Sequence, residues 1–251
     1  MRFIFQHREL LWLLIRRDLA VRTSGTVIGG LWMILQPALQ VAALWFLLDL
    51  VLKVKFPGLP GGFVGYYLTG MIPWLFLAEV TQRSLGVLPE YGALYQRSLF
   101  PLPLLPLIPV AVSGGIYSSI YICVAQLLFG WHGAIGALVL MGSVVIWVVP
   151  FAYGFAVLGL FIRDLQQLAP FVLTMLMYAT PILYLPDAFP KSLHWWLVIN
   201  PFAHMVRAAH ALVQGQPWHS VDAVGLLLLW LLALPAIKLY RRAEPHMREA
   251  L

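Results

Sequence analysis

The feature that most restricts the fold of this chain is the stretch from Ser98 to Ile162, which contains no aspartate, glutamate, lysine or arginine. A helix that crosses a bilayer needs about 20 mostly apolar residues, because about 30 Å of hydrocarbon is crossed at about 1.5 Å per residue. The stretch is too long for one crossing. The turn-forming sequence FGWHG at Phe129–Gly133 therefore predicts two spans, near 107–129 and 135–161.

Four more apolar runs predict further crossings. Across the chain 61% of residues are hydrophobic and 10% are charged, whereas about 25% of the residues of a typical soluble domain are charged. A chain this apolar needs lipid as part of its solvent. We therefore expect an all-α integral membrane protein, a single domain over residues 1–251, with six transmembrane helices near 26–49, 63–84, 107–129, 135–161, 165–186 and 221–239.

The lysines and arginines predict the orientation, because cytoplasmic loops are enriched in them. With the N-terminus inside, twelve of the 16 lie on the cytoplasmic side, and only Lys53, Lys55, Lys191 and Arg207 lie outside. Both termini are therefore expected in the cytoplasm. The net charge of +6 comes from these anchoring residues, which form no stripe of the kind that binds nucleic acid.

Two segments are too polar to cross the membrane. Residues 2–22 mix apolar side chains with five arginines, which predicts an amphipathic helix along the cytoplasmic interface, with topological anchoring by positive charge as the alternative. Residues 187–220 hold three tryptophans and four histidines. Short re-entrant half-helices between spans five and six would explain this composition, and a plain loop is the alternative.

The motifs of several enzyme classes are absent from the sequence. No lysine follows the glycines of a GxxxxGK[ST] phosphate loop, and neither GxSxG, HExxH nor a DxD pair occurs. The lone Cys123 lies in an apolar run and is interpreted as a packing residue. We expect no catalytic residue, metal site or cofactor in this chain.

Glu79 lies within the second predicted span, and Asp49 lies at the outer end of the first. Glu79 and Arg83 are four residues apart on one helix face, so we predict that they pair and lower each other's cost in lipid. Proton-coupled carriers usually place carboxylates near the bilayer midplane. Glu79 is expected toward the cytoplasmic end, which argues against a secondary transporter.

Several motifs occur in the order found in one family. The sequence resembles the membrane subunits of ABC-2-type exporters of O-antigen, capsule and teichoic-acid polymers. The resemblance rests on Arg17–Trp32 (RDLAVRTSGTVIGGLW), Gly70–Phe76 (GMIPWLF), Leu99–Pro101, Leu105–Leu107, Arg163–Leu165, Thr180–Tyr184 (TPILY), Asn200–Phe202 and Arg241–Arg242. It departs from the family at Arg207, where glutamate is common, at His210 (arginine), at Pro103 (glutamate) and at Thr23 (tyrosine).

The resemblance implies an assembly and a cargo. The chain would form a homodimer in the bacterial inner membrane, with two copies of a separate cytoplasmic ABC ATPase that binds ATP and Mg. The dimer would export an undecaprenyl-diphosphate-linked polysaccharide such as O-antigen or capsule. The loop near 86–104 would couple to the ATPase and gate the channel, through Tyr91, Tyr95, Arg97, Phe100 and Pro101.

Two groups of side chains are candidates for contact with such a cargo. Arginine offers paired donors that match phosphate oxygens, so the head group of the lipid diphosphate would meet Arg16, Arg17, Arg22 and Arg97, for which positive-inside anchoring is the alternative. Aromatic faces on which sugar rings slide are the second group. Candidates on spans two and five are Tyr66, Tyr67, Trp74, Phe76, Tyr178 and Tyr184, for which core packing or an aromatic belt is the alternative.

Three other functions stay open from the sequence. The chain could be a secondary transporter of a small solute, an ABC-2 exporter of a substrate other than polysaccharide, or an intramembrane enzyme that modifies lipids.

Overall fold

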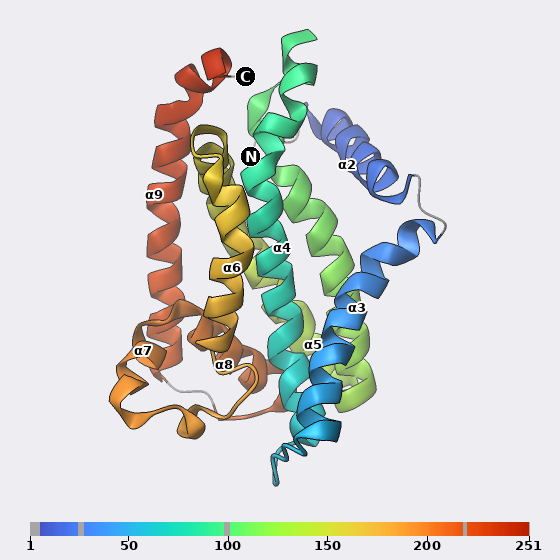
Figure 1. The fold of residues 1–251 in the computed structure, drawn as a ribbon, viewed down its shortest axis with the longest axis vertical. Coiled ribbons are helices and arrows are strands. Elements are labelled where there is room, and N and C mark those ends of the chain that lie inside the picture. Colours follow the sequence, from blue (N-terminus) through green and yellow to red (C-terminus); the bar gives the residue numbers. More distant parts are fainter. Residues whose placement is uncertain (1–5, 25–27, 98–100, 218–219, 251) are drawn as a thin grey trace.

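The structure, a computed structural model, describes residues 6–24, 28–97, 101–217 and 220–250. Within these ranges the chain forms helices and no strand, so the all-α prediction is confirmed. Figure 1 shows a helical bundle with α4 through its middle. The helices are α2 (Arg8–Thr23), α3 (Trp32–Trp45), α4 (Gly62–Arg97), α5 (Leu107–Phe161), α6 (Asp164–Tyr178), α7 (His194–Ile199), α8 (Pro201–Gln214) and α9 (Ser220–Ala250).

Three helical stretches are long and apolar enough to cross a membrane: Gly29–Val51, Gly62–Gly92 and Leu102–Phe161. The first consists of a 3-10 turn (Gly29–Leu31), α3 and a π-helical turn (Phe46–Val51). The third has 60 residues, far more than one crossing needs. These stretches agree with the prediction of an integral membrane protein.

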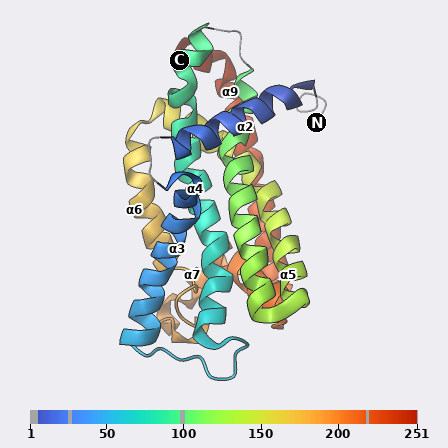
Figure 2. The same cartoon turned by 90° about the vertical axis from the view of Figure 1, so that its right-hand side faces the viewer.

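Helix α5 is two helical arms joined at Gly130, which has a non-helical backbone (φ 68°, ψ −158°). A positive φ is accessible to glycine because it has no Cβ. The arms run back along each other as a hairpin (Figure 2). Val110 and Gly114 of the first arm line a surface crevice together with Val145 of the second. The chain therefore reverses within the predicted turn at Phe129–Gly133.

Helix α6 ends at Tyr178, whereas the sequence predicted a fifth span extending to Pro186. Pro181 explains the early end, because proline lacks an N–H and disfavours helical geometry in the residue before it. The hydroxyl of Thr180 donates to the carbonyl of Leu176 at 2.7 Å and closes the last turn. The hydroxyl of Tyr66 donates to the freed Pro181 carbonyl at 2.9 Å.

Helix α2 lies across one end of the bundle, where the C-terminal part of α9 also lies (Figure 2). A buried apolar cluster at this end anchors α2 to the bundle. Its members come from four helices and include Leu14 of α2, Leu88 of α4, Ile108 of α5 and Met247 of α9. The predicted helix at 2–22 is thus present as α2 and is packed on the protein, while residues 2–5 lie outside the described ranges.

The described part of the segment between α6 and α9 contains two helices, α7 and α8, rather than a plain loop. Asn200 caps α8, because its side-chain oxygen accepts a hydrogen bond from the backbone N–H of Phe202 at 3.0 Å. Pro201 occupies the first turn of α8, and Gly215 follows its last turn with a φ of 70°. Buried residues of α8 such as Met205 and Val206 join the main core formed by α4 and α5.

Candidate functional site

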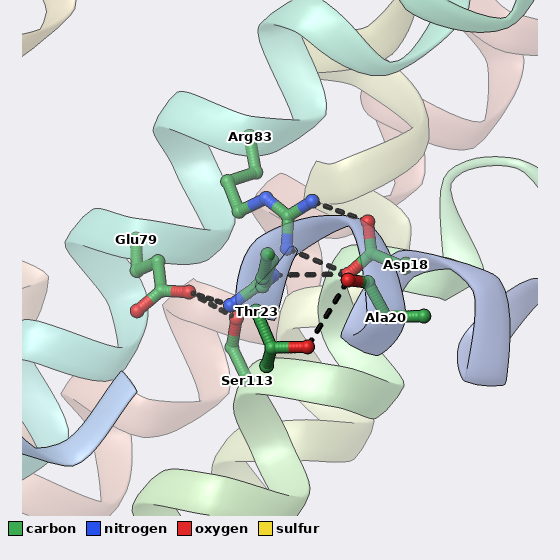
Figure 3. Close-up of polar contacts among 7 residues, drawn as sticks. Asp18, Ala20, Thr23, Glu79, Arg83 and Ser113 are labelled. Carbon is green, nitrogen blue, oxygen red and sulfur yellow. Dashed lines mark hydrogen bonds and ion pairs between the residues drawn. The ribbon is translucent and has the colours of Figure 1, made fainter. Parts of the chain in front are cut away.

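Ion pairs join α2 to α4 at the cluster formed by Asp18, Arg22, Glu79, Arg83 and Ser113 (Figure 3). Arg83 of α4 donates two hydrogen bonds to the carboxylate of Asp18, at 2.9 and 2.5 Å. Arg22 donates to Asp18 at 3.0 Å and to Glu79 at 2.8 Å. We call these five residues the α2–α4 ion-pair network.

The predicted pairing of Glu79 with Arg83 is wrong. The Glu79 carboxylate accepts hydrogen bonds from Arg22 of α2 and from the hydroxyl of Ser113 on α5, at 2.8 Å each. Arg83 is bound to Asp18 instead. Arg83 binds both carboxylate oxygens of Asp18. This pairing is favourable because the two N–H groups of a guanidinium match the two oxygens of one carboxylate.

Because the network is buried, its charged groups need one another as partners. Asp18 is only 3% exposed, and an isolated carboxylate at such a site would lose most of its hydration. Its two arginine partners and Glu79 make the network electrically neutral, with two cations and two anions. One nitrogen of Arg22, Nη2, is buried and has no hydrogen-bond partner. Helix α2 is therefore held to α4 by charge as well as by its apolar face.

The network borders a groove of about 820 Å³ between α3, α4 and α6. Arg22, Glu79 and Arg83 all line this groove, so the ion pairs are part of its wall. The other polar and aromatic lining residues are Trp32, Gln36, Gln40, Trp74, Gln82, Tyr117, Thr174 and Tyr178. A groove lined by amides and aromatic rings, with no metal cluster among the described residues, is suited to bind polyhydroxylated molecules loosely.

The predicted sugar-path aromatics divide into two groups. Tyr178 lines the groove and is exposed, whereas Trp74 lines it from the core, with only 2% of its surface exposed. Tyr66, Tyr67 and Phe76 are in the core of the chain, so their assignment to the path is corrected to core packing. The hydroxyls of Tyr66 and Tyr67 donate to main-chain carbonyls of other segments.

Tyr184 stacks on Phe189 with a centroid distance of 5.6 Å, in the segment that follows α6.

Sequence reasoning missed the polar part of the groove. Gln36 and Gln40 are four residues apart within an apolar span, and that spacing places two amides on one helix face. This signal could have identified them.

The predicted cationic residues also divide. Arg16 and Arg17 are exposed on α2, where their guanidinium groups lie over the rings of Trp12 (5.3 Å) and Tyr91 (5.4 Å). Arg22 is held by Asp18 and Glu79. Among the coupling candidates, Tyr91 is buried in the cluster under α2, and Pro101 precedes a 3-10 turn (Leu102–Leu104). Phe100 and the side chains of Tyr95 and Arg97 lie outside the described residues.

A second buried polar cluster joins α8 to α9. Nδ1 of His204 lies 2.7 Å from Nη2 of Arg207 and 3.2 Å from Oδ1 of Asp222, and its Nε2 lies 2.8 Å from the carbonyl of Val198. Arg207 also pairs with the buried Asp222 of α9. The arginine that departs from the family pattern is thus compensated within the chain.

His210, the other departure on α8, is buried and stacks on Tyr66 with a centroid distance of 4.0 Å. Burial lowers the pKa of His210 to about 3, and the nearby side chain of Gln214 offsets part of this shift. Both ring nitrogens of His210 are buried without a hydrogen-bond partner. This helix is outside the predicted spans. The ring is therefore neutral at pH 7, as a residue in the core must be.

This burial predicts an acid-sensitive fold. Unfolded His210 takes up a proton near its ordinary pKa of about 6.5, whereas the folded ring does so only near pH 3. Stability is therefore full above pH 6.5 and falls by up to about 1.4 kcal/mol per pH unit below it. The midpoint temperature of thermal unfolding should fall less between pH 7 and 5 in His210→Phe than in wild type. The exposed His246→Gln is the control, and an equal slope in His210→Phe would refute the assignment.

The long apolar helices indicate an integral membrane protein, with a neutral ion-pair network at one end and a lined groove beside it. Comparison with known proteins gives the family. The family model for the ABC-2 type transporter matches residues 9–213. The chain therefore belongs to the ABC-2 type transporter family, as its motifs indicated.

Named relatives narrow this further. The chain is 29% identical to the O-antigen export system permease protein RfbA of Klebsiella pneumoniae, over 79% of this chain and 77% of that protein. It is 25% identical to the protein of the same name from Myxococcus xanthus, over 91% and 92% of the two chains. It is also 25% identical to the polysialic acid transport protein KpsM of Escherichia coli, over 92% of each.

Proposed function

We propose that this chain is the membrane subunit of an ABC exporter that moves a lipid-linked polysaccharide of the O-antigen or capsule kind across the bacterial inner membrane. The observation that carries the proposal is the groove between α3, α4 and α6, in a chain whose named relatives are polysaccharide export proteins. Its lining combines glutamine amides with aromatic faces. Sugar rings stack on aromatic faces, and their hydroxyls bond to amides.

The proposed topology has six crossings. They are α3 with its flanking turns, α4, the two arms of α5, α6 with the turn that follows it, and α9. An even number of crossings returns the chain to its starting side, and α2 and the end of α9 lie at one end of the bundle (Figures 1 and 2). The excess of arginine and lysine at that end supports a cytoplasmic location for both termini.

The groove is open in one chain and would be closed by a second copy. Large apolar side chains are exposed on both helices that flank it, among them Ile34 and Leu39 of α3 and Phe171 and Val172 of α6. In a homodimer these faces would enclose a path for the polymer. Loose contacts with rings and amides would let the chain of sugars slide.

Power would come from a separate cytoplasmic ATPase, present in two copies, which binds ATP and Mg. Helix α2 and residues 86–104 are the surfaces that it would push; the sequence predicted a loop there, but residues up to Arg97 are the end of α4. Displacement of α2 reaches the groove directly, because Arg22 connects Asp18 of α2 with Glu79 in the groove wall. Arg16 and Arg17 are exposed for a lipid diphosphate, whereas Arg22 could bind one only by leaving its carboxylates.

The groove is tested with Tyr178→Ala, in cells that depend on this chain for surface polysaccharide. Tyr178 lines the groove and is partly exposed, so the fold should tolerate its loss. Removing one stacking ring, worth about 0.5–1.5 kcal/mol, should lower export roughly three- to tenfold at equal protein level. Trp131→Ala, an exposed aromatic at the turn between the two arms of α5 and outside the groove, should export normally. Normal export by Tyr178→Ala would refute the groove as the path.

The alternative functions give different results in two assays. Disabling the ATP site of the co-purifying ATPase should stop export, and transport that continues on an ion gradient would indicate a secondary carrier. The purified chain, incubated alone with lipid-linked sugar, should form no new covalent product. Such a product would indicate a lipid-modifying enzyme instead.

A further inference from the structure

A second surface, lined by the second arm of α5 and by residues of α4, α6 and α9, has the features of a lipid site. Phe151, Phe155 and Leu158 are spaced four and three residues apart, so they form one stripe along α5. This stripe lines two separate crevices, of about 480 and 460 Å³. We call the stripe and its two crevices the α5–α9 groove.

The first crevice, between α5 and α9, ends at two cations. Its apolar lining from α9 is Pro235, Ala236 and Leu239. Lys238 and Arg242 of the same helix also line it; both are exposed, and their spacing of four residues places them on one face. Neither forms an ion pair with any residue that the structure describes.

The second crevice runs between α4, α5 and α6, and apart from Thr81 its lining is apolar or aromatic. Leu165, Leu168 and Val172 of α6 form its far wall. The two crevices share only the α5 stripe as lining, and the two cations line the first crevice. This shape matches a molecule with two apolar chains and one negatively charged head.

We propose that the α5–α9 groove binds one anionic phospholipid of the surrounding membrane. The phosphate lies between Lys238 and Arg242, and the two acyl chains lie in the two crevices on either side of the Phe151–Leu158 stripe. Basic pockets between transmembrane helices bind anionic head groups in this way. Because the crevices are lined by α4, α5, α6 and α9, the lipid would hold α6 and α9 to the same arm of α5.

The occupant is membrane lipid rather than the exported cargo. The first crevice shares no lining residue with the groove between α3, α4 and α6, so a head group at Lys238 is separated from the proposed path. The second crevice shares Trp74 and Leu173 with that groove, so one acyl chain would adjoin the wall of the path. Charge complementarity selects an anionic lipid over a zwitterionic one. The site does not depend on the proposed export function, because it needs only the membrane.

The experiment is native mass spectrometry of the full-length chain with its co-purifying ATPase, after incubation with phosphatidylglycerol or phosphatidylcholine. Wild type should retain phosphatidylglycerol preferentially. Lys238→Gln and Arg242→Gln should each lower its retention about fivefold, as expected for loss of one basic residue near a lipid phosphate. Arg241→Gln removes an equal charge from the adjacent exposed position outside the groove and should retain the lipid as wild type does.

Three outcomes would overturn the proposal. Equal retention of the two lipids by wild type would show that the site has no preference for an anionic head group. An equal loss of phosphatidylglycerol in Arg241→Gln would show only a general charge effect. Displacement of phosphatidylglycerol by an equal amount of polyprenyl diphosphate would assign the groove to the cargo. As a second variant, Leu158→Trp narrows both crevices and should lower retention of either lipid; unchanged retention would contradict the placement of the acyl chains.

Discussion

Replacement of Asp18 by asparagine is expected to detach α2 from α4 and to abolish export. Asp18 is buried and binds both Arg22 and Arg83, and the substitution leaves two partly buried arginines with Glu79 as their only carboxylate. Breaking a buried ion pair by removal of one partner costs about 3–5 kcal/mol. Thermal unfolding in detergent measures this loss, and surface polysaccharide measures coupling at equal protein level.

A double-mutant cycle separates the pairing from the burial. Arg83→Gln leaves Asp18 with Arg22, and the Asp18→Asn/Arg83→Gln double variant leaves Arg22 with Glu79 in a balanced pair. The double variant should therefore be clearly more stable than the sum of the single effects predicts. Glu9→Gln, an exposed carboxylate on the same helix, is the control. Additive effects in the cycle would show that Asp18 and Arg83 do not interact.

Replacement of Gly159 by alanine is expected to prevent stable folding. A Cβ at this position would lie 1.9 Å from the carbonyl oxygen of Leu85, so the backbones of α4 and α5 touch where they cross. Gln166 closes the same crossing by donating to the Leu85 carbonyl at 3.1 Å. Overpacking typically costs about 1–3 kcal/mol, and more where main chain must move.

The measurement for Gly159 is the folded fraction after solubilisation, by size-exclusion chromatography and thermal unfolding. Gly142→Ala is the matched control, because this glycine is on the same helix and a Cβ there has no neighbour within 4 Å. Since alanine has the higher helix propensity, the control should fold at least as well as wild type. A Gly159→Ala protein with normal stability would refute the close crossing.

Much of the candidate site could be anticipated, but its pairings could not. Asp18 belongs to a motif that pointed to the family, and Glu79 and Arg83 were singled out as a pair on one helix face. Helical spacing shows which residues share a face, yet it does not show which neighbouring helix covers that face. Asp18, which α2 brings against α4, is the partner that Arg83 takes.

The aromatic residues show the same division. Both Trp74 and Phe76 belong to the core, and spacing in α4 cannot show that only Trp74 also lines the groove. That distinction arises from the positions of α3, α5 and α6 around α4.

The sequence by itself determined that the protein folds in a lipid environment, that it is helical and which family it belongs to. Uncharged runs of about 20 residues predict helices, because a helix satisfies all its backbone groups internally and needs that length to cross the hydrocarbon. Only the tertiary structure decided that Arg22 connects Asp18 to Glu79, that glutamines and selected rings line one groove, and that two cations stand at the end of another. These are contacts between segments far apart in the chain, and they depend on how the helices pack rather than on any local pattern.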